Sequence, residues 1–115
     1  MSDFRFPSRV EKLRQRLAKD ELDAIFISNG ENRRYVSGFV SSAGYLLVTQ
    51  NDAVICTDFR YTELAEQQAP GWRIDRIGGP SDWLAKLVKE FEIKTLGFES
   101  DDMTVSTLER FKKAL

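Results

Sequence analysis

The chain has 115 residues, of which 42% are hydrophobic and 30% are charged, with 17 basic side chains against 18 acidic ones. This composition is typical of one globular domain, and a net charge of −1 excludes bulk electrostatic attraction to nucleic acid or to an anionic membrane. No basic and apolar leader opens the sequence, and no apolar run approaches the roughly 20 residues of a membrane span, so the cytoplasm is the expected compartment.

The sequence contains no histidine and a single cysteine, Cys56. Histidine is the commonest metal ligand and the usual general base near neutral pH, so its absence counts against a catalytic centre built by this chain alone. Glu63 and Glu66 share a helical face but have no further ligands nearby, which argues against a metal site. Cys56 lies in an apolar segment, where a buried thiol is expected. We therefore expect no catalytic residue, metal or cofactor in this chain.

The first elements are a helix and a buried strand. Ser8 and Glu11 have the spacing of a capping box, and the apolar residues that follow recur at helical intervals, which predicts a helix over Arg9–Lys19. The unbroken apolar run Ala24–Ile27 is typical of a strand buried on both faces. We expect the helix to cross over a sheet that contains this strand.

A short helix and a hairpin come next. Glu31–Val36 predicts the helix, which Gly38 would end, and its flanking glycines do not make a phosphate-binding pattern. Tyr45–Thr49 and Ala53–Thr57 are short apolar segments of β-forming residues, separated by a three-residue stretch suited to a tight turn. Because both arms are apolar almost throughout, we expect the hairpin to be covered on both faces.

Helices and strands alternate after the hairpin. The predicted order is a helix over Tyr61–Gln68, a strand over Trp72–Ile77, a helix starting at Pro80-Ser81-Asp82, a strand over Thr95–Glu99, and a last helix capped by Thr104. The strand over Trp72–Ile77 alternates bulky and charged residues, which predicts a position near the sheet edge. The inward-facing residues of the last helix are predicted to be Val105, Leu108, Phe111 and Leu115.

This alternation predicts an α/β fold over residues 1–115: a single domain with a mixed, mostly parallel sheet of about five strands, a central hairpin and helices on both faces. The last helix has an apolar face that needs a neighbour. We therefore expect the chain to be part of a longer protein.

Two stretches are candidates for recognition. Asp58, Arg60 and Tyr61 come at the end of a strand, where α/β proteins place the groups that bind their ligands. Asp58 has the chemistry to cap the following helix, and Arg60 has a planar fork of donors that suits a carboxylate. The alternative is that both residues stabilise this corner, by capping and by local ion pairing. The small residues 41–44 form a loop free to carry contacts.

Three segments together resemble the N-terminal domain of the creatinase, prolidase and aminopeptidase P family, the metallopeptidases with a pita-bread catalytic domain. They are Asn32-Arg33-Arg34-Tyr35-Val36-Ser37-Gly38-Phe39, Gly44-Tyr45-Leu46-Leu47-Val48-Thr49 and Thr57-Asp58-Phe59-Arg60-Tyr61. The similarity covers nearly the whole chain, and it implies the layering of a ribonuclease H-like fold.

The resemblance also implies a division of labour. In this family two divalent metal ions, of manganese, cobalt or zinc, are held by a C-terminal catalytic domain that is absent from this chain. The N-terminal domain is associated with homodimer formation and with gating of the active site, so that short proline-containing peptides enter. Residues 1–115 would then be the non-catalytic part of a Xaa-Pro peptidase, either a prolidase or an aminopeptidase P.

The resemblance implies eight candidates for substrate-gate or dimer contacts: Asn32, Tyr35, Phe39, Ser41, Ser42, Asp58, Arg60 and Tyr61. Two alternatives remain open. The first is the N-terminal domain of a creatinase-type amidinohydrolase, which shares the fold and uses no metal. The second is a free-standing module that binds a small anion at the corner formed by residues 58–61.

Overall fold

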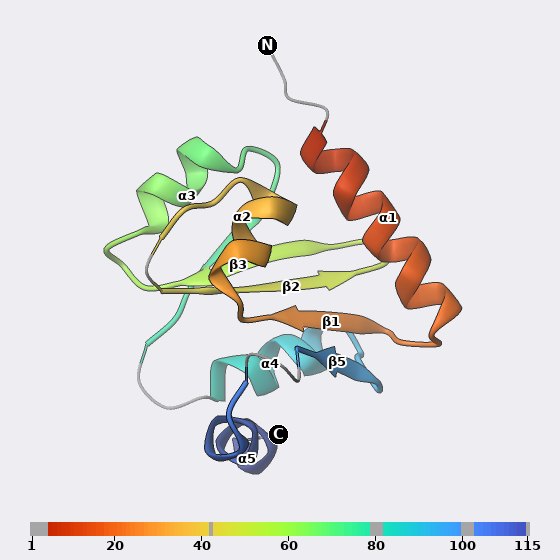
Figure 1. Cartoon of the computed structure of the whole chain (residues 1–115). Helices are drawn as coiled ribbons and strands as arrows, with labels where there is room; N and C mark the ends of the chain where they lie inside the picture. Colours follow the sequence, from red (N-terminus) through yellow and green to blue (C-terminus); the bar gives the residue numbers. More distant parts are fainter. Residues whose placement is uncertain (1–4, 42, 79–81, 100–102, 115) are drawn as a thin grey trace.

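The computed structural model describes residues 5–41, 43–78, 82–99 and 103–114, and Figure 1 shows their arrangement. The elements are α1 (Arg5–Lys19), β1 (Ala24–Ile27), α2 (Gly30–Ser37), β2 (Tyr45–Thr49), β3 (Ala53–Thr57), α3 (Thr62–Gln68), β4 (Arg73–Arg76), α4 (Asp82–Glu90), β5 (Leu96–Phe98) and α5 (Val105–Ala114). The predicted order of helices and strands is confirmed.

The five strands form one sheet in the order β4-β3-β2-β1-β5. β2 pairs antiparallel with β1 and with β3, whereas β1 pairs parallel with β5 and β3 pairs parallel with β4. Four strands therefore run in one direction and β2 alone runs against them. The mixed, mostly parallel sheet with a central hairpin is confirmed, and β4 lies at an edge, as its alternating pattern predicts.

Helices cover both faces of the sheet, with α1, α2 and α3 on one face and α4 and α5 on the other (Figure 1). Successive residues of a strand point to opposite faces, so the hairpin contributes to two cores. Leu46 and Ile55 belong to the cluster under α1, α2 and α3, whereas Leu47 and Val54 belong to the cluster under α4 and α5. All four side chains are fully buried, which is why both hairpin arms are apolar almost throughout.

Two turns follow directly from their residues. At the tip of the hairpin, Thr49 Oγ1 accepts hydrogen bonds from the amides of Asn51 and Asp52, at 3.2 and 2.9 Å. Gly38 ends α2 in the left-handed region at φ 83°, and its amide donates to the Arg34 carbonyl. A Cβ on Gly38 would lie 3.1 Å from the Phe6 ring, so both space and backbone angle favour glycine there.

Two details of the helices differ from the sequence prediction. α1 includes Arg5, so Ser8 and Glu11 lie inside the helix and the predicted capping box is wrong. Val105 is 72% exposed on α5, so its predicted inward orientation is also wrong, whereas Phe111 is buried as predicted. Leu115 and the predicted start of α4 at residues 80 and 81 lie outside the described residues. Among the described residues, none of the helices combines the length and apolar character needed to cross a membrane.

Candidate functional site

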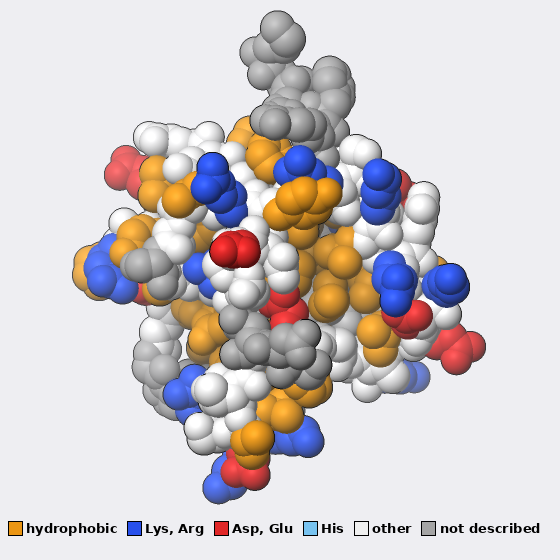
Figure 2. All heavy atoms as spheres, viewed as in Figure 1, with side chains coloured by type: hydrophobic (Ala, Val, Ile, Leu, Met, Phe, Trp, Pro, Cys, Tyr) orange, Lys and Arg blue, Asp and Glu red, His pale blue; other side chains and the backbone are white. Residues whose placement is uncertain are grey.

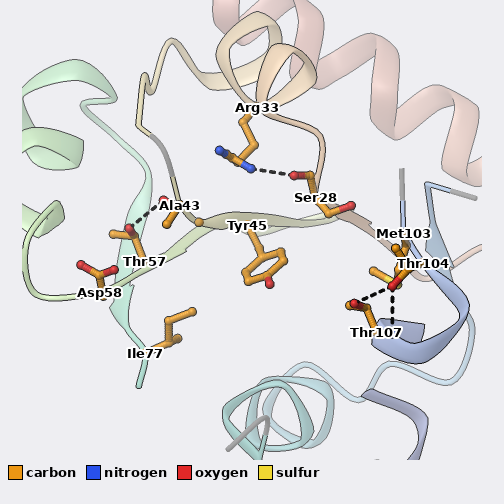
Figure 3. Close-up of a pocket in the computed structure, with 11 residues that line it drawn as sticks. Ser28, Arg33, Ala43, Tyr45, Thr57, Asp58, Ile77, Met103, Thr104 and Thr107 are labelled. Carbon is orange, nitrogen blue, oxygen red and sulfur yellow. Dashed lines mark hydrogen bonds between the residues drawn. The ribbon is translucent and has the colours of Figure 1, made fainter. Parts of the chain in front are cut away.

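The carboxyl ends of β1, β3, β4 and β5 lie at the same end of the sheet, which we call its carboxyl edge. Open α/β sheets bind their ligands at these strand ends. A pocket of about 380 Å³ lies at this edge (Figure 3). Ser28 reaches it from the end of β1, Asp58 from the end of β3, and Ile77 from the end of β4. The rest of its lining is formed by Arg33, Ala43, Gly44, Tyr45, Thr57, Met103, Thr104 and Thr107.

Buried polar side chains organise one wall of this pocket. Arg33 of α2 is only 6% exposed, and its guanidinium donates to the Ser28 carbonyl at 2.6 Å and to the Ser41 carbonyl at 3.1 Å. Thr57 Oγ1, at the end of β3, donates to the Ala43 carbonyl at 3.2 Å. These bonds, two of which Figure 3 marks, tie the loop before β2 to the ends of β1 and β3.

The loop between α2 and β2 is attached at several points. Val40 donates its amide to Gln68 Oε1 of α3 at 2.8 Å, and Ser41 Oγ donates to the Ala43 carbonyl at 2.6 Å. Phe39 is 1% exposed and packs in the core, so its side chain is not available for the substrate or dimer contact that the sequence predicts. Ser42 lies outside the described residues. Of the predicted loop residues, Ser41 is therefore the one that the structure places beside the pocket.

The corner after β3 is organised by a local ion pair. Asp58 accepts hydrogen bonds from the Arg60 amide at 3.0 Å and from Arg60 Nε and Nη2 at 3.0 and 2.8 Å. The Arg60 side chain is the main cause of the lowered pKa of Asp58. α3 begins at Thr62, and the residue at its N-cap, Tyr61, makes no side-chain capping bond. The predicted capping role of Asp58 is therefore wrong, whereas the alternative of local ion pairing is confirmed.

Asn32 and Tyr35 lie on α2 and have different surroundings. The Asn32 amide group donates to the carboxylate of Glu99, so this side chain is used within the domain. Tyr35 is 58% exposed, and the Arg9 guanidinium carbon lies 3.9 Å from its ring centroid. Arg9 also donates to the backbone carbonyl of Tyr35 at 2.8 Å, which holds the Arg9 side chain against the end of α2. Tyr35 thus presents an ordered aromatic surface of the kind found in protein interfaces.

The surface over α1 carries several Lys and Arg side chains, with hydrophobic side chains showing between α1 and α2 (Figure 2). Arg14 forms a hydrogen bond to the sheet, in which its Nε donates to the Thr49 carbonyl at 2.8 Å. Arg16 pairs with Asp20 one turn later. This basic face is therefore used in part to attach the helix to the domain.

Of the seven predicted site residues that the structure describes, Asp58 lines the pocket, and Ser41 contacts it through Arg33. The site residues predicted from the sequence do not include Arg33 or Glu99. Arg33 precedes Val36 and Ser37 at helical spacing, a signal that places it on the buried face of α2. Glu99 directly follows the apolar residues of β5 at the carboxyl edge, but its partners lie 67 to 71 residues away in the sequence.

The described residues contain no group of three or more histidine, cysteine, aspartate or glutamate side chains that could hold a metal ion. Cys56 is fully buried, and burial is the main cause of the raised pKa of its thiol. The donor set of the described residues therefore does not fit a pair of divalent metal ions.

Fold and site together define a layered α/β domain with a polar pocket at the carboxyl edge of its sheet. The family model described as the Creatinase/Prolidase N-terminal domain matches residues 9–115, and the chain belongs to this family.

Individual relatives agree with this assignment. The chain is 40% identical over 100 residues to the uncharacterized peptidase YqhT of Bacillus subtilis, covering 86% of this chain and 28% of that protein. The structure of a Xaa-Pro dipeptidase from Bacillus anthracis matches with a TM-score of 0.89 at 38% identity, over 94% of this chain and 31% of that one. The N-terminal domain of the cytoplasmic peptidase PepQ from Mycobacterium tuberculosis matches with a TM-score of 0.87 at 40% identity, over 94% and 85% of the two chains.

The chain spans less than a third of the length of the first two of these relatives.

Proposed function

We propose that residues 1–115 are the non-catalytic N-terminal domain of a metal-dependent Xaa-Pro peptidase of the prolidase or aminopeptidase P type, working in the cytoplasm as a homodimer. The observation that carries the proposal is the match, over nearly the whole chain, to a Xaa-Pro dipeptidase about three times as long. The two metal ions, manganese, cobalt or zinc, would belong to a C-terminal pita-bread domain.

We further propose that the domain helps to gate the active site for short proline-containing peptides. The side chains of Tyr35 and Val40, with Ser41 and Ser42 of the same loop, are our candidates for this contact. Tyr35 and Val40 are 58% and 49% exposed, so this segment presents apolar surface that another chain can cover. Asp58 and Arg60 form an ion pair at the corner after β3, and the Tyr61 ring lies beside Arg60. We include these three residues in the candidate contact surface.

The catalytic part of the proposal is tested by comparing this chain with the full-length protein. With Mn²⁺ and a Xaa-Pro dipeptide, we expect hydrolysis by the full-length protein and none by the purified 115-residue chain. Turnover by the chain alone would overturn the proposal. Hydrolysis of creatine instead of Xaa-Pro peptides by the full-length protein would favour the amidinohydrolase alternative.

The gating part is tested by adding bulk at the loop. Ser41→Trp in the full-length protein is expected to raise KM for proline-containing peptides, because the indole would narrow the entrance. The matched control is Gln50→Trp, which adds the same bulk at the exposed hairpin tip on the opposite edge of the sheet. Equal kinetic constants for Ser41→Trp and the unmodified protein would remove the gate from the proposal.

A further inference from the structure

Glu99, the first residue after β5, contacts the start of α2 through both carboxylate oxygens. Oε1 accepts hydrogen bonds from the amides of Ser28 and Asn29 at 2.7 and 2.8 Å, and Oε2 accepts one from Asn32 Nδ2. We call these three bonds the Glu99 clamp. The clamp joins the last strand of the sheet to the turn between β1 and α2.

The clamp has a favourable electrostatic setting. Asn29 is the N-cap of α2, and its side chain accepts a hydrogen bond from the Asn32 amide at 3.0 Å, so the helix begins where the Glu99 carboxylate lies. Negative charge is stabilised at a helix N-terminus, and hydrogen bonds to a carboxylate are stronger than those between neutral groups. The first turn of α2 is therefore fixed from two sides, by its own N-cap and by Glu99.

A chain of hydrogen bonds continues from the clamp to the candidate gate. The Ser28 amide binds Glu99, and the Ser28 carbonyl accepts from Arg33 Nη1 at 2.6 Å. Arg33 is buried and donates through Nη2 to the Ser41 carbonyl at 3.1 Å. Glu99 and Ser41 are thus connected through one residue of the β1–α2 turn and one buried side chain.

We propose that Glu99 is a positioning residue that couples the end of β5 to Ser41 in the loop before β2, and that Asn32 serves the Glu99 clamp instead of contacting a substrate or a partner subunit. The inference rests on the proposed function only where it gives this loop a role as a gate. The coupling itself is a property of the 115-residue chain.

The clamp is tested by exchanging its two side-chain groups, the carboxylate at position 99 and the amide at position 32. Asn32→Asp places a second carboxylate against Glu99, and the repulsion is expected to open the clamp. Glu99→Gln keeps one carbonyl oxygen for the amides of Ser28 and Asn29. In the double variant, the amide introduced at position 99 donates to the carboxylate introduced at position 32, which closes the clamp again. An aspartate in the first turn of a helix is itself favourable, so only the pairing with Glu99 makes Asn32→Asp harmful.

The measurement is amide hydrogen exchange along the chain. Asn32→Asp is expected to speed exchange in the first turn of α2 and at the bonded amides of Phe39 and Val40 by about tenfold, the factor that corresponds to one lost charge-assisted hydrogen bond. The amides of β2 and β3, which are interior strands of the sheet, should change less. The double variant is expected to restore the exchange rates of the unmodified chain. Asn51→Asp, which adds the same charge at the hairpin tip, should leave both segments unchanged.

Two results would overturn the inference. In the first, the double variant exchanges as fast as Asn32→Asp alone, which excludes the clamp as the cause. In the second, the first turn of α2 loosens while the amides of Phe39 and Val40 keep their protection, which excludes the coupling. Because peptide hydrolysis is not measured, failure of the proposed gate in the full-length protein leaves these outcomes unaffected.

Discussion

The ion pair of Asp58 with Arg60 makes a pH-dependent contribution to stability. The Arg60 guanidinium holds the pKa of Asp58 below its ordinary value of 3.8. A carboxyl whose pKa is lower in the folded chain than in the unfolded one stabilises the fold above the unfolded pKa, and this stabilisation is lost as the pH falls through the folded value. We expect Asp58→Asn to lower the thermal unfolding midpoint at pH 7, and the difference from the unmodified chain to shrink below pH 3.8.

Circular dichroism melts between neutral and acid pH measure this difference. Glu63→Gln removes an exposed carboxylate from the following helix, and it serves as the control for the change in net charge. A difference between Asp58→Asn and the unmodified chain that stays constant into strong acid would show that the ionised pair is not its cause.

Cys56 is predicted to be unreactive while the domain is folded. Its side chain is fully buried in the core under α4 and α5, and burial raises the pKa of its thiol, which suppresses the reactive thiolate. We expect a thiol reagent to label Cys56 only when denaturant unfolds the chain. Ser106→Cys, at an exposed position of α5, provides a thiol that should react at once in the native protein. Rapid native labelling of Cys56 would contradict its placement in the core.

Single residues show where sequence patterns stop being informative. The burial of Cys56 and the left-handed Gly38 were predictable, because each depends on its neighbours in the chain. The predicted contact role of Phe39 is wrong, because the motif that contains Phe39 does not show which way its side chain points. The left-handed turn at Gly38 directs the Phe39 ring into the core. The pairing of Asn32 with Glu99 joins residues 67 positions apart, and local spacing carries no information about such a contact.

At the scale of elements, α5 is held mainly by one aromatic cluster. The Phe111 ring lies 5.3 Å from Phe26, 5.8 Å from Tyr45 and 5.9 Å from Trp83, measured between centroids, and each pair meets edge to face. Loss of a buried phenylalanine ring costs about 3–5 kcal/mol. We expect Phe111→Ala to lower the free energy of unfolding by this amount and to expose α5 to limited proteolysis.

The matched control for Phe111 lies in the first turn of the same helix. Val105 is 72% exposed, so Val105→Ala is expected to change the free energy of unfolding by less than about 0.5 kcal/mol. Denaturant titration measures both variants. Equal losses for Phe111→Ala and Val105→Ala would contradict the aromatic cluster as the attachment of α5.

The elements themselves were largely predictable, because apolar runs and helical periodicity are local signals. The start of α1 was placed too late, since the spacing of Ser8 and Glu11 imitates a capping box inside a helix that tolerates Pro7 in its first turn. The position of β5 beside β1 could not be predicted. That pairing is decided by how the whole sheet packs between its two helical layers, which no single segment encodes.

At the scale of the whole molecule, both helical layers pack against one shared sheet, so the domain should unfold as one unit. Leu46 is buried under α1, α2 and α3, and Leu87 of α4 is buried on the opposite face. Leu46→Ala and Leu87→Ala are each expected to lower the free energy of unfolding by about 2–5 kcal/mol through lost packing and a residual cavity. Because neither helical layer has a sheet of its own, a substitution that loosens one layer should also lower the hydrogen-exchange protection of amides in the other layer.

Hydrogen exchange separates this behaviour from independent unfolding of the layers. The slowest amides of β2 and β3 should lose protection by the same factor as the measured loss of global stability, whichever leucine is removed. Fluorescence and circular dichroism should give coincident denaturation curves for both variants. If Leu87→Ala released α4 and α5 while the amides under α1 kept full protection, the two faces would be separate cooperative units, and the shared hairpin would not transmit stability between them.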